Sequence, residues 1–381
     1  MTLNRRQFLG SAALPLIALG SGAPAQAADT ASAEPDKTVV FGGDSAPHTP
    51  AGDAAALQAL LQLHPDAADS YLGGGAVAAL EAKFSALLGK EDTVFMPTGT
   101  LANHIAIRLL CGDARHALVQ QESHVYRDES DCITTLSGIN LVPLAAGKAA
   151  PTLDEIFDAI KRAEVGPYPI KVGAIALESP VRRAEGATVP AALIAEVAKL
   201  AREKHIPMHL DGARLLLMHG IEGFDVKSYC APFDTVYVSL YKYLGAPYGA
   251  VLSGTRTMMA HARELRHLFG GTQYHAWQAA LPALAALDGF EQRQAAVRAA
   301  GEQLLAGLEK TPGFKVQRVE HGSNIALIDI APAQQAGLEQ RLKRAQIRAG
   351  GLVNGRLRLT FNETLLRRDT AYLLAAFGAK A

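Results

Sequence analysis

The stretch "VYVSLYKYLGAPYGA", residues 236–250, joins an apolar, strand-like run to a lysine. Lys242 stands between two tyrosines and is followed by a glycine-containing turn. A lysine that is merely solvated needs no such setting. A lysine that reacts through its neutral amine does, because burial lowers its pKa. The rest of the chain decides between these two alternatives.

Strand and helix patterns alternate along the chain from residue 76 onward. Apolar runs typical of strands occur at 92–97, 116–121, 140–144, 171–180, 206–213 and 234–241. Helical spacing occurs at 76–89, 101–112, 152–164 and 189–205. We expect Gly89 to end the first of these helices, and Thr152 with Glu155 to form a capping box. This alternation predicts a mostly parallel sheet that is covered by helices on both faces.

The 381 residues are enough for two or more domains. After residue 276 a long helical region runs to about 308, and the strand patterns "FKVQRVE", "NIALIDIA" and "GRLRLTF" follow, with a helix near 333–348 and a last helix at the end. We therefore expect a large α/β domain at 76–285 and a small α/β domain at 286–381. Residues 28–75 are expected to form an N-terminal arm with one short helix near "DAAALQALLQL".

The charge balance points away from nucleic acid and from acidic surfaces as partners. Lys plus Arg and Asp plus Glu both number 37, so the formal net charge is zero. The three cysteines, Cys111, Cys132 and Cys230, are widely spaced and odd in number. Their spacing is not that of a metal site, so we expect reduced cysteines, no disulfide framework and no bound metal.

The first 27 residues have the pattern of a signal peptide. "NRRQFLG" precedes the apolar run "SAALPLIALG", and the small-residue pattern "APAQA" ends near Ala27. The apolar run is too short to span a bilayer, so no membrane span is expected in the mature chain. Arg5 and Arg6, with the Gln-Phe that follows, resemble a twin-arginine signal, which implies export of a folded protein to the periplasm or beyond. The alternative is an ordinary secretory signal that contains two arginines.

Polar residues follow four of the predicted strands. "TGT" follows the first strand, and Glu178, Asp211 and Lys242 stand at the ends of later ones. Ligands of open α/β sheets bind beyond the carboxyl ends of the strands. The pattern therefore predicts hydroxyls, two carboxylates and a lysine at one edge of one sheet.

The segment "PTGTLANHIAI" is suited to binding phosphate. Thr98, Gly99 and Thr100 lie between a strand and a helix, where unpaired N–H groups and the helix dipole attract an anion. The alternative is a plain helix cap, and Thr100 alone would serve as one. No P-loop lysine follows, so a nucleoside triphosphate is not expected.

Asp211 lies at the end of a buried strand, where a carboxylate needs a partner. That partner is either Arg214, three residues later, or a ligand cation such as a protonated pyridine nitrogen. A phosphate site, a carboxylate for a ring nitrogen and a strand-end lysine fit one cofactor, pyridoxal 5′-phosphate. Lys242 is then the lysine that carries the cofactor, while Asp211 keeps the ring nitrogen protonated.

These motifs resemble the threonine aldolase and β-eliminating lyase group of fold-type I pyridoxal-phosphate enzymes. The resemblance rests on "VFMPTGTLANHIAI", "ESHVY", "MHLDGARL", "SLYKYLGAPYGAVLSG" and "LFGGTQY", and it extends from residue 41 to about 362. It implies a lyase with a large, mostly parallel-sheet domain, a small C-terminal domain and a site at the interface of a homodimer or homotetramer.

The resemblance also implies roles for single residues. It implies that Gly99 and Thr100 bind the phosphate, that His124 stacks on the ring and transfers protons, and that Asp211 pairs with the ring nitrogen. It also implies that Arg214 contacts the cofactor oxygens and that Lys242 carries the cofactor. For the substrate, it implies that Arg358 binds the carboxylate and that Asp44 and Ser45 make further contacts. For Arg358 the residues themselves add that "RLRLTF" alternates, so Arg356, Arg358 and Thr360 share one face. The alternatives are a solvated strand face for Arg358 and a histidine with internal partners for His124.

The chain departs from the aldolase pattern near the substrate. Gly43 stands at a serine position in "GGDS", "ESPVRRAEG" replaces an Asn-Thr-His-Asn run after Glu178, and "YLGGG" around Tyr71 is reduced. The expected activity is cleavage of a β-hydroxy-α-amino acid, L-threonine or a relative, to glycine and an aldehyde. The alternatives are β-elimination to a keto acid and ammonia, or an exported binding protein without catalysis.

Overall fold

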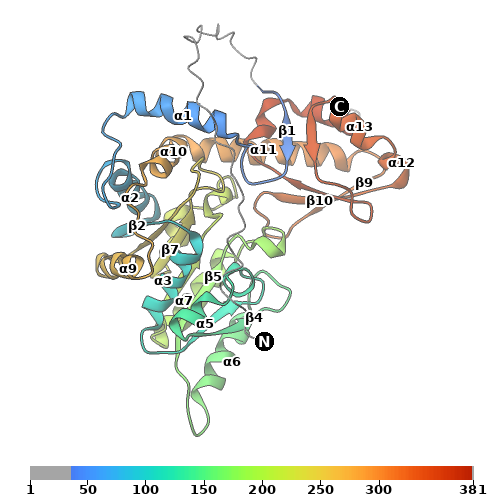
Figure 1. Ribbon diagram of the computed structural model, residues 1–381. Helices are drawn as coiled ribbons and strands as arrows, with labels where there is room; N and C mark the ends of the chain where they lie inside the picture. Colours follow the sequence, from blue (N-terminus) through green and yellow to red (C-terminus); the bar gives the residue numbers. More distant parts are fainter. Residues whose placement is uncertain (1–35, 380–381) are drawn as a thin grey trace, which may run out of the picture. The chain divides into compact units, whose positions relative to one another are not determined.

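The computed structural model describes residues 36–379, and its core is a seven-stranded sheet (Figure 1). The strand order is β2 (Asp92–Met96), β8 (Ala250–Gly254), β7 (Thr235–Ser239), β6 (Met208–Asp211), β5 (Val172–Glu178), β3 (His116–Gln120) and β4 (Asn140–Leu144). The six predicted strands are all present. β8 was not predicted, and it returns antiparallel to both β7 and β2 after the Lys242 turn.

Only β8 runs against the other strands of this sheet. The carboxyl ends of β2, β3, β5, β6 and β7 therefore meet at one edge. The mostly parallel sheet predicted from the alternation is confirmed, as is the meeting of four polar strand ends along a single edge.

Helices cover both faces of the sheet, and successive buried residues of a strand pack on opposite faces. Leu118 packs with α2 (Gly75–Leu88), α6 (Leu153–Glu164), α7 (Ala191–Glu203), α8 (Val226–Cys230) and α10 (Trp277–Leu287). Its neighbours Ala117 and Val119 pack on the other face, with α3 (Gly99–Cys111) and α5 (Cys132–Ser137). α9 (Arg256–Leu268) also packs against α3. Thr152 and Glu155 form both bonds of the predicted capping box, and Gly89 ends α2 in the left-handed conformation.

A second sheet, antiparallel in the order β12 (Arg356–Thr360), β10 (Ile325–Ile330) and β9 (Phe314–Arg318), belongs to the C-terminal part. It packs with α11 (Phe290–Glu309), α13 (Leu338–Arg344) and α14 (Thr370–Phe377) around a separate core. β11 (Ile347–Ala349) pairs in parallel with β1 (Val39–Phe41), so an N-terminal strand joins the C-terminal part (Figure 1).

Two local predictions in these regions were wrong. The helix expected near 333–348 is split into α12 (Pro332–Gln335) and α13, and its end is the strand β11. β1 was missed because three residues are too few to show an alternating pattern. α1 (Pro50–Leu63) agrees with the helix predicted in the arm.

The short connecting elements are α4 (His124–Arg127) and the 3₁₀ turns at Arg182–Ala184, Leu215–Met218 and Glu363–Arg367. Cys111, Cys132 and Cys230 are free thiols. No helix within residues 36–379 is long and apolar enough to cross a membrane. The predicted signal peptide, residues 1–27, lies outside the described residues.

Candidate active site

The start of α3 lies directly beyond the end of β2. Thr98 is the N-cap residue, and its side chain accepts a hydrogen bond from the Leu101 N–H at 3.2 Å. The alternative that Thr100 is the cap is therefore wrong. The N–H groups of Gly99 and Thr100 lie in the first turn, where a helix offers them no internal acceptor, so they are available to an anion.

Gly99 is required by its contact with β7. A Cβ at this position would lie 2.1 Å from the hydroxyl oxygen of Tyr237, so no larger residue fits without movement. Ser239 ends the same strand, and its hydroxyl is buried. The start of α3 thus packs directly against the Tyr237 hydroxyl.

Asp211 is held by a chain of buried hydrogen bonds. Its Oδ1 accepts from the Ala213 N–H at 3.1 Å, and its Oδ2 accepts from the Asn103 amide at 2.9 Å. The Asn103 carbonyl oxygen lies 3.0 Å from His209 Nε2, and His209 Nδ1 lies 2.9 Å from the Thr235 hydroxyl. Because an amide oxygen only accepts, Nε2 of His209 carries the proton. Burial lowers the pKa of His209 to about 4, so the ring is neutral.

His124 is the first residue of α4 and is partly exposed. Its Nδ1 lies 3.1 Å from Oε1 of Glu129, a buried carboxylate that also accepts from the Asn103 amide at 2.9 Å. This hydrogen bond raises the pKa of His124, burial opposes it, and the charge of Asp211 adds to the rise. Asn103 therefore connects the carboxylate that holds His124 to Asp211.

Glu178 organises the backbone around the site. Its Oε2 accepts from the His124 N–H at 2.6 Å, and its Oε1 accepts from the Arg182 N–H at 2.8 Å. Burial raises the pKa of Glu178, and the nearby carboxylate of Asp211 raises it further. The side chain thus fixes the positions of two other site residues.

Lys242 lies just beyond β7, beside this network. Its pKa is lowered, first by burial and then by the positive charge of Arg214, while Asp211, Glu178 and Asp44 oppose the shift. Its Nζ lies 5.5 Å from the centre of the Tyr241 ring, and no residue described by the structure makes a hydrogen bond or ion pair with it. The lysine therefore has the low-pKa setting that a reactive amine needs, with its nitrogen free.

Arg214 pairs with the N-terminal arm. Its Nε donates to Oδ2 of Asp44 at 2.8 Å, and both side chains are largely buried. The alternative of an Asp211–Arg214 pair is therefore wrong. Gly43, which precedes Asp44, has φ +77°, which explains glycine at the serine position, and Ser45 donates only to the neighbouring Ala46 carbonyl at 3.3 Å.

Arg358 reaches the site from the small sheet. Its Nε donates to Glu185 at 2.6 Å and its Nη1 donates to Thr360 at 3.1 Å. Its Nη2 is buried without a partner among the described residues, although the side chain as a whole is 32% exposed. A guanidinium that is fixed at two nitrogens and unpaired at the third is suited to an incoming carboxylate.

The profile of the beta-eliminating lyase family matches residues 48–331, which is most of the chain. The chain belongs to this family.

Two named relatives agree with this assignment. The probable low-specificity L-threonine aldolase 2 of Arabidopsis thaliana is 27% identical over 319 residues, which cover 81% of this chain and 89% of the relative. A putative aromatic amino acid beta-eliminating lyase/threonine aldolase from Exiguobacterium has a TM-score of 0.75 at 25% identity, covering 89% of this chain and 96% of that one. A putative L-allo-threonine aldolase of Listeria monocytogenes, 23% identical with a TM-score of 0.75, covers 90% and 95% and shows the shared fold. The predicted fold and enzyme type, a lyase of the threonine aldolase type, are confirmed.

The family depends on pyridoxal phosphate, and the residues of this member fit that cofactor. The helix start and the buried Ser239 hydroxyl fit a phosphate, Asp211 fits a ring nitrogen and the free amine of Lys242 fits an aldehyde. These groups come from the start of α3 and from the ends of β6 and β7, which explains why no single motif identified the cofactor.

The sequence patterns missed five residues of this lyase site: Asn103, Glu129, Glu185, His209 and Ser239. Two of them carried a usable signal. His209 alternates with Asp211 along β6 and so shares its face, and Asn103 lies one helical turn after Gly99. Glu129 and Glu185 lie in irregular segments, where spacing carries no such information.

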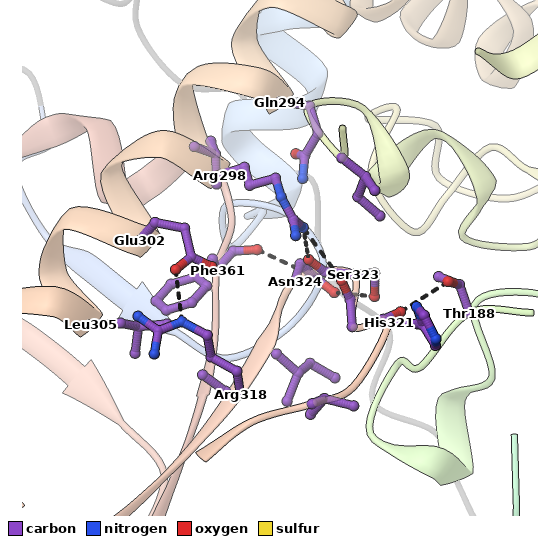
Figure 2. A pocket seen from close by; sticks show the side chains of 16 residues that line it. Thr188, Gln294, Arg298, Glu302, Leu305, Arg318, His321, Ser323, Asn324 and Phe361 are labelled. Carbon is purple, nitrogen blue, oxygen red and sulfur yellow. Dashed lines mark hydrogen bonds and ion pairs between the residues drawn. The ribbon is translucent and has the colours of Figure 1, made fainter. Parts of the chain in front are cut away.

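A separate pocket of about 190 Å³ lies between α11 and the segment before β10 (Figure 2). Arg298 Nη1 donates to the carbonyl oxygens of Ser323 at 2.7 Å and Gly322 at 3.4 Å, and Arg318 pairs with Glu302 at 2.9 Å. None of the predicted site residues of the lyase lines this pocket, and no lining side chain is buried without a hydrogen-bond partner among the described residues.

Proposed function

We propose that the protein binds pyridoxal 5′-phosphate at this strand edge and cleaves a β-hydroxy-α-amino acid, L-threonine or a relative, to glycine and an aldehyde. The observation that carries the proposal is the Lys242 amine, which has no hydrogen-bond or ion-pair partner among the described residues and lies near the Asp211 carboxylate. The similarity to low-specificity L-threonine aldolases supports the same reaction.

Each residue would hold one part of the cofactor. The N–H groups of Gly99 and Thr100 and the Ser239 hydroxyl would bind the phosphate, Asp211 would bind the ring nitrogen, and Lys242 would hold the aldehyde. When bound, the cofactor supplies an electron sink for the electrons released at Cα. The Asn103 and Ala213 bonds keep Asp211 oriented toward the ring nitrogen.

The remaining residues bind the substrate and move one proton. Arg358 Nη2 binds the α-carboxylate and orients the Cα–Cβ bond, with Glu185 and Thr360 fixing the guanidinium. His124 accepts the β-hydroxyl proton at Nε2, because Glu129 holds its Nδ1. Arg214, held by Asp44, would contact the cofactor oxygens, and Asp44 and Ser45 on the same arm would contact the substrate.

The attachment of the cofactor is tested by borohydride reduction of the loaded mature protein, followed by peptide mapping. We expect the modification on Lys242. Lys90 is the matched control, since burial also lowers its pKa, but its Nζ already donates to the Phe233 carbonyl oxygen at 2.5 Å. Modification of Lys90 in place of Lys242 would contradict the assignment.

The reaction is tested by incubation with L-threonine, L-allo-threonine and L-serine, with assays for aldehyde and for keto acid. Aldehyde that is lost in Lys242→Ala supports aldol cleavage. Formation of keto acid without aldehyde would show that the reaction is β-elimination. If the cofactor-loaded protein forms neither product, the alternative of an exported binding protein remains.

We further propose that residues 1–27 act as a twin-arginine signal that exports the folded protein to the periplasm. The support is the Arg5–Arg6 pair, the short apolar run and the small residues before Ala28. Replacing both arginines by lysine is expected to retain the protein in the cytoplasmic fraction. Unchanged export of that variant would favour an ordinary secretory signal.

A homodimer or homotetramer is also proposed. α1 has no buried residue, although most of its side chains are apolar. Leu63, Tyr71 and Tyr274 are 74%, 67% and 60% exposed, and a second copy that covered them would remove apolar surface from water. Light scattering after gel filtration is expected to give at least twice the monomer mass.

A further inference from the structure

Two neighbouring arginines after β5 have different surroundings. Arg183 donates from Nε to Asp128 at 3.0 Å and from Nη2 to the same carboxylate at 2.5 Å. Arg182 makes a backbone bond to Glu178, but its guanidinium has no hydrogen-bond or ion-pair partner within the part of the chain that the structure describes. Arg182 therefore has free hydrogen-bond donors that Arg183 lacks.

The backbone places Arg182 beside the reacting part of the site. The Glu178 carboxylate accepts from the N–H of Arg182 on one oxygen and from the N–H of His124 on the other, so these two residues lie next to each other. Three residues after Arg182, Glu185 accepts from Arg358. Arg182 thus lies next to His124, the proposed base, and three residues before Glu185, which holds the arginine proposed to bind the α-carboxylate.

The charges around Arg182 favour an additional anion. Arg182 is exposed to solvent, but partial burial of its guanidinium lowers its pKa, and the positive charges of Arg214 and Arg358 lower it further. Three carboxylates near Arg182 already accept hydrogen bonds: Asp44 accepts from Arg214, Glu185 accepts from Arg358, and Glu178 accepts from two backbone N–H groups. An anion bound at Arg182 would therefore accept hydrogen bonds from N–H groups that no protein side chain uses. It would also reduce the repulsion among the guanidinium groups of Arg182, Arg214 and Arg358.

We propose that Arg182 binds a second carboxylate, carried on Cβ of the substrate, so that the preferred substrate is a β-hydroxy-α-amino dicarboxylic acid. This inference rests on the proposed aldol cleavage and specifies its substrate. The α-carboxylate binds Arg358, and the Cβ carboxylate binds Arg182. L-Threonine carries a methyl group at that position and leaves the Arg182 donors unpaired.

The simplest such substrate is β-hydroxyaspartate. The β-hydroxyl loses its proton to His124, the Cα–Cβ bond breaks, its electron pair stays on Cα, and Cα gains a proton. The products are glycine and glyoxylate, which together contain all atoms of the substrate, and no oxidant or reductant is consumed. The aldehyde product therefore carries the carboxylate that Arg182 has bound.

The test compares the cofactor-loaded wild type with Arg182→Ala, and Arg183→Ala is the matched control. The measured quantity is the ratio of kcat/KM for L-β-hydroxyaspartate, in both Cβ configurations, to kcat/KM for L-threonine and L-allo-threonine. We expect the wild type to prefer the dicarboxylic substrate, and Arg182→Ala to lower that ratio by roughly tenfold to a hundredfold, the loss expected for one charge-assisted pair. Arg183→Ala should leave the ratio unchanged.

Binding of L-aspartate and L-alanine, which have no β-hydroxyl, is measured by difference absorbance and is independent of cleavage. Wild type should bind L-aspartate more tightly, and Arg182→Ala should remove that preference. If threonine is cleaved but both ratios are insensitive to Arg182, the inference is overturned and the proposed function stands. An equal loss for all substrates would assign Arg182 to the α-carboxylate and would also overturn it.

If no substrate is cleaved but L-aspartate binding still depends on Arg182, the recognition of the second carboxylate is supported and aldol cleavage fails. If no substrate is cleaved and L-aspartate is not preferred, both proposals fail. Arg182→Lys separates charge from geometry, because lysine keeps the charge but lacks the planar donor pair. A partial recovery of the substrate ratio in that variant is the expected result.

Discussion

The pocket in Figure 2 and the strand-edge site are both polar, yet their hydrogen bonding differs. In the pocket, Arg298 donates to backbone carbonyls and Arg318 pairs with Glu302, so the polar groups satisfy one another. Lys242 Nζ at the strand edge and Arg358 Nη2 on the small sheet have no partner among the described residues. A concave shape alone would favour the pocket, whereas unpaired polar groups favour the strand edge.

This difference has a physical cause. Leaving a buried donor or acceptor unpaired costs about 1–3 kcal/mol, so a folded chain retains such groups chiefly where a ligand or a reaction uses them. A satisfied network, by contrast, stabilises the fold without any ligand. The hydrogen-bond state of the groups is thus a better indicator of chemistry here than the volume of the pocket.

The largest expected effect on activity comes from Asp211→Asn. The amide keeps the shape of the side chain but cannot hold a ring nitrogen protonated, so we expect kcat to fall by about a thousandfold with the fold retained. Asp225→Asn is the control, since Asp225 only caps α8 by accepting from Ser228 at 2.8 Å. A loss of less than tenfold in Asp211→Asn would show that the buried network is merely structural, like that of the pocket.

Arg358→Ala is the next strongest change. Removal of the guanidinium that binds the α-carboxylate should lower kcat/KM by roughly a hundredfold for every amino acid tested. Arg356→Ala is the matched control on the same strand, because Arg356 pairs with Asp329 at 2.7 Å and lies outside the site. Equal effects of the two substitutions would mean that the unpaired Nη2 of Arg358 does not identify a binding group.

Much of this architecture could be predicted from the sequence. The alternation of strands and helices gave the parallel sheet, and polar residues after Met96, Leu177, Leu210 and Ser239 indicated the edge where chemistry occurs. Both inferences depend on local patterns, such as periodicity and the position of a residue at the end of a strand. Such patterns remain valid whatever the tertiary packing.

The pairings within the site could not be predicted in this way. Asp44 meets Arg214 across 170 residues and Glu185 meets Arg358 across 173, so no local spacing relates them. β1 and β11 were missed for the same reason, since a three-residue strand is stabilised by its distant partner and not by its own pattern. The choice of Asp44 over Asp211 as the partner of Arg214 also depends on the fold of the arm.

A smaller effect is expected from Glu129→Gln. His124 acts as a base only when its ring is unprotonated, so activity rises as the pH rises through its pKa. The Glu129 hydrogen bond raises that pKa, and glutamine lacks the charge that does so. The acid limb of the kcat/KM profile should therefore move to lower pH. A limb that does not move would mean that His124 is not the titrating base.

The smallest effect on activity is expected from Arg298→Met in the pocket. The methionine keeps much of the apolar stem but leaves the carbonyl oxygens of Gly322 and Ser323 without this donor. We expect kcat/KM to stay within about twofold of wild type, while the free energy of unfolding falls by about 1–3 kcal/mol. Arg318→Met is the control, since its ion pairs are exposed and their loss should cost no more than about 1 kcal/mol. Denaturant unfolding and the aldehyde assay measure the two quantities on the same samples. If the Arg298→Met protein is stable but inactive, the pocket and not only the strand edge is functional. An arginine whose hydrogen bonds are all made within the protein would then matter to the reaction and not to the fold.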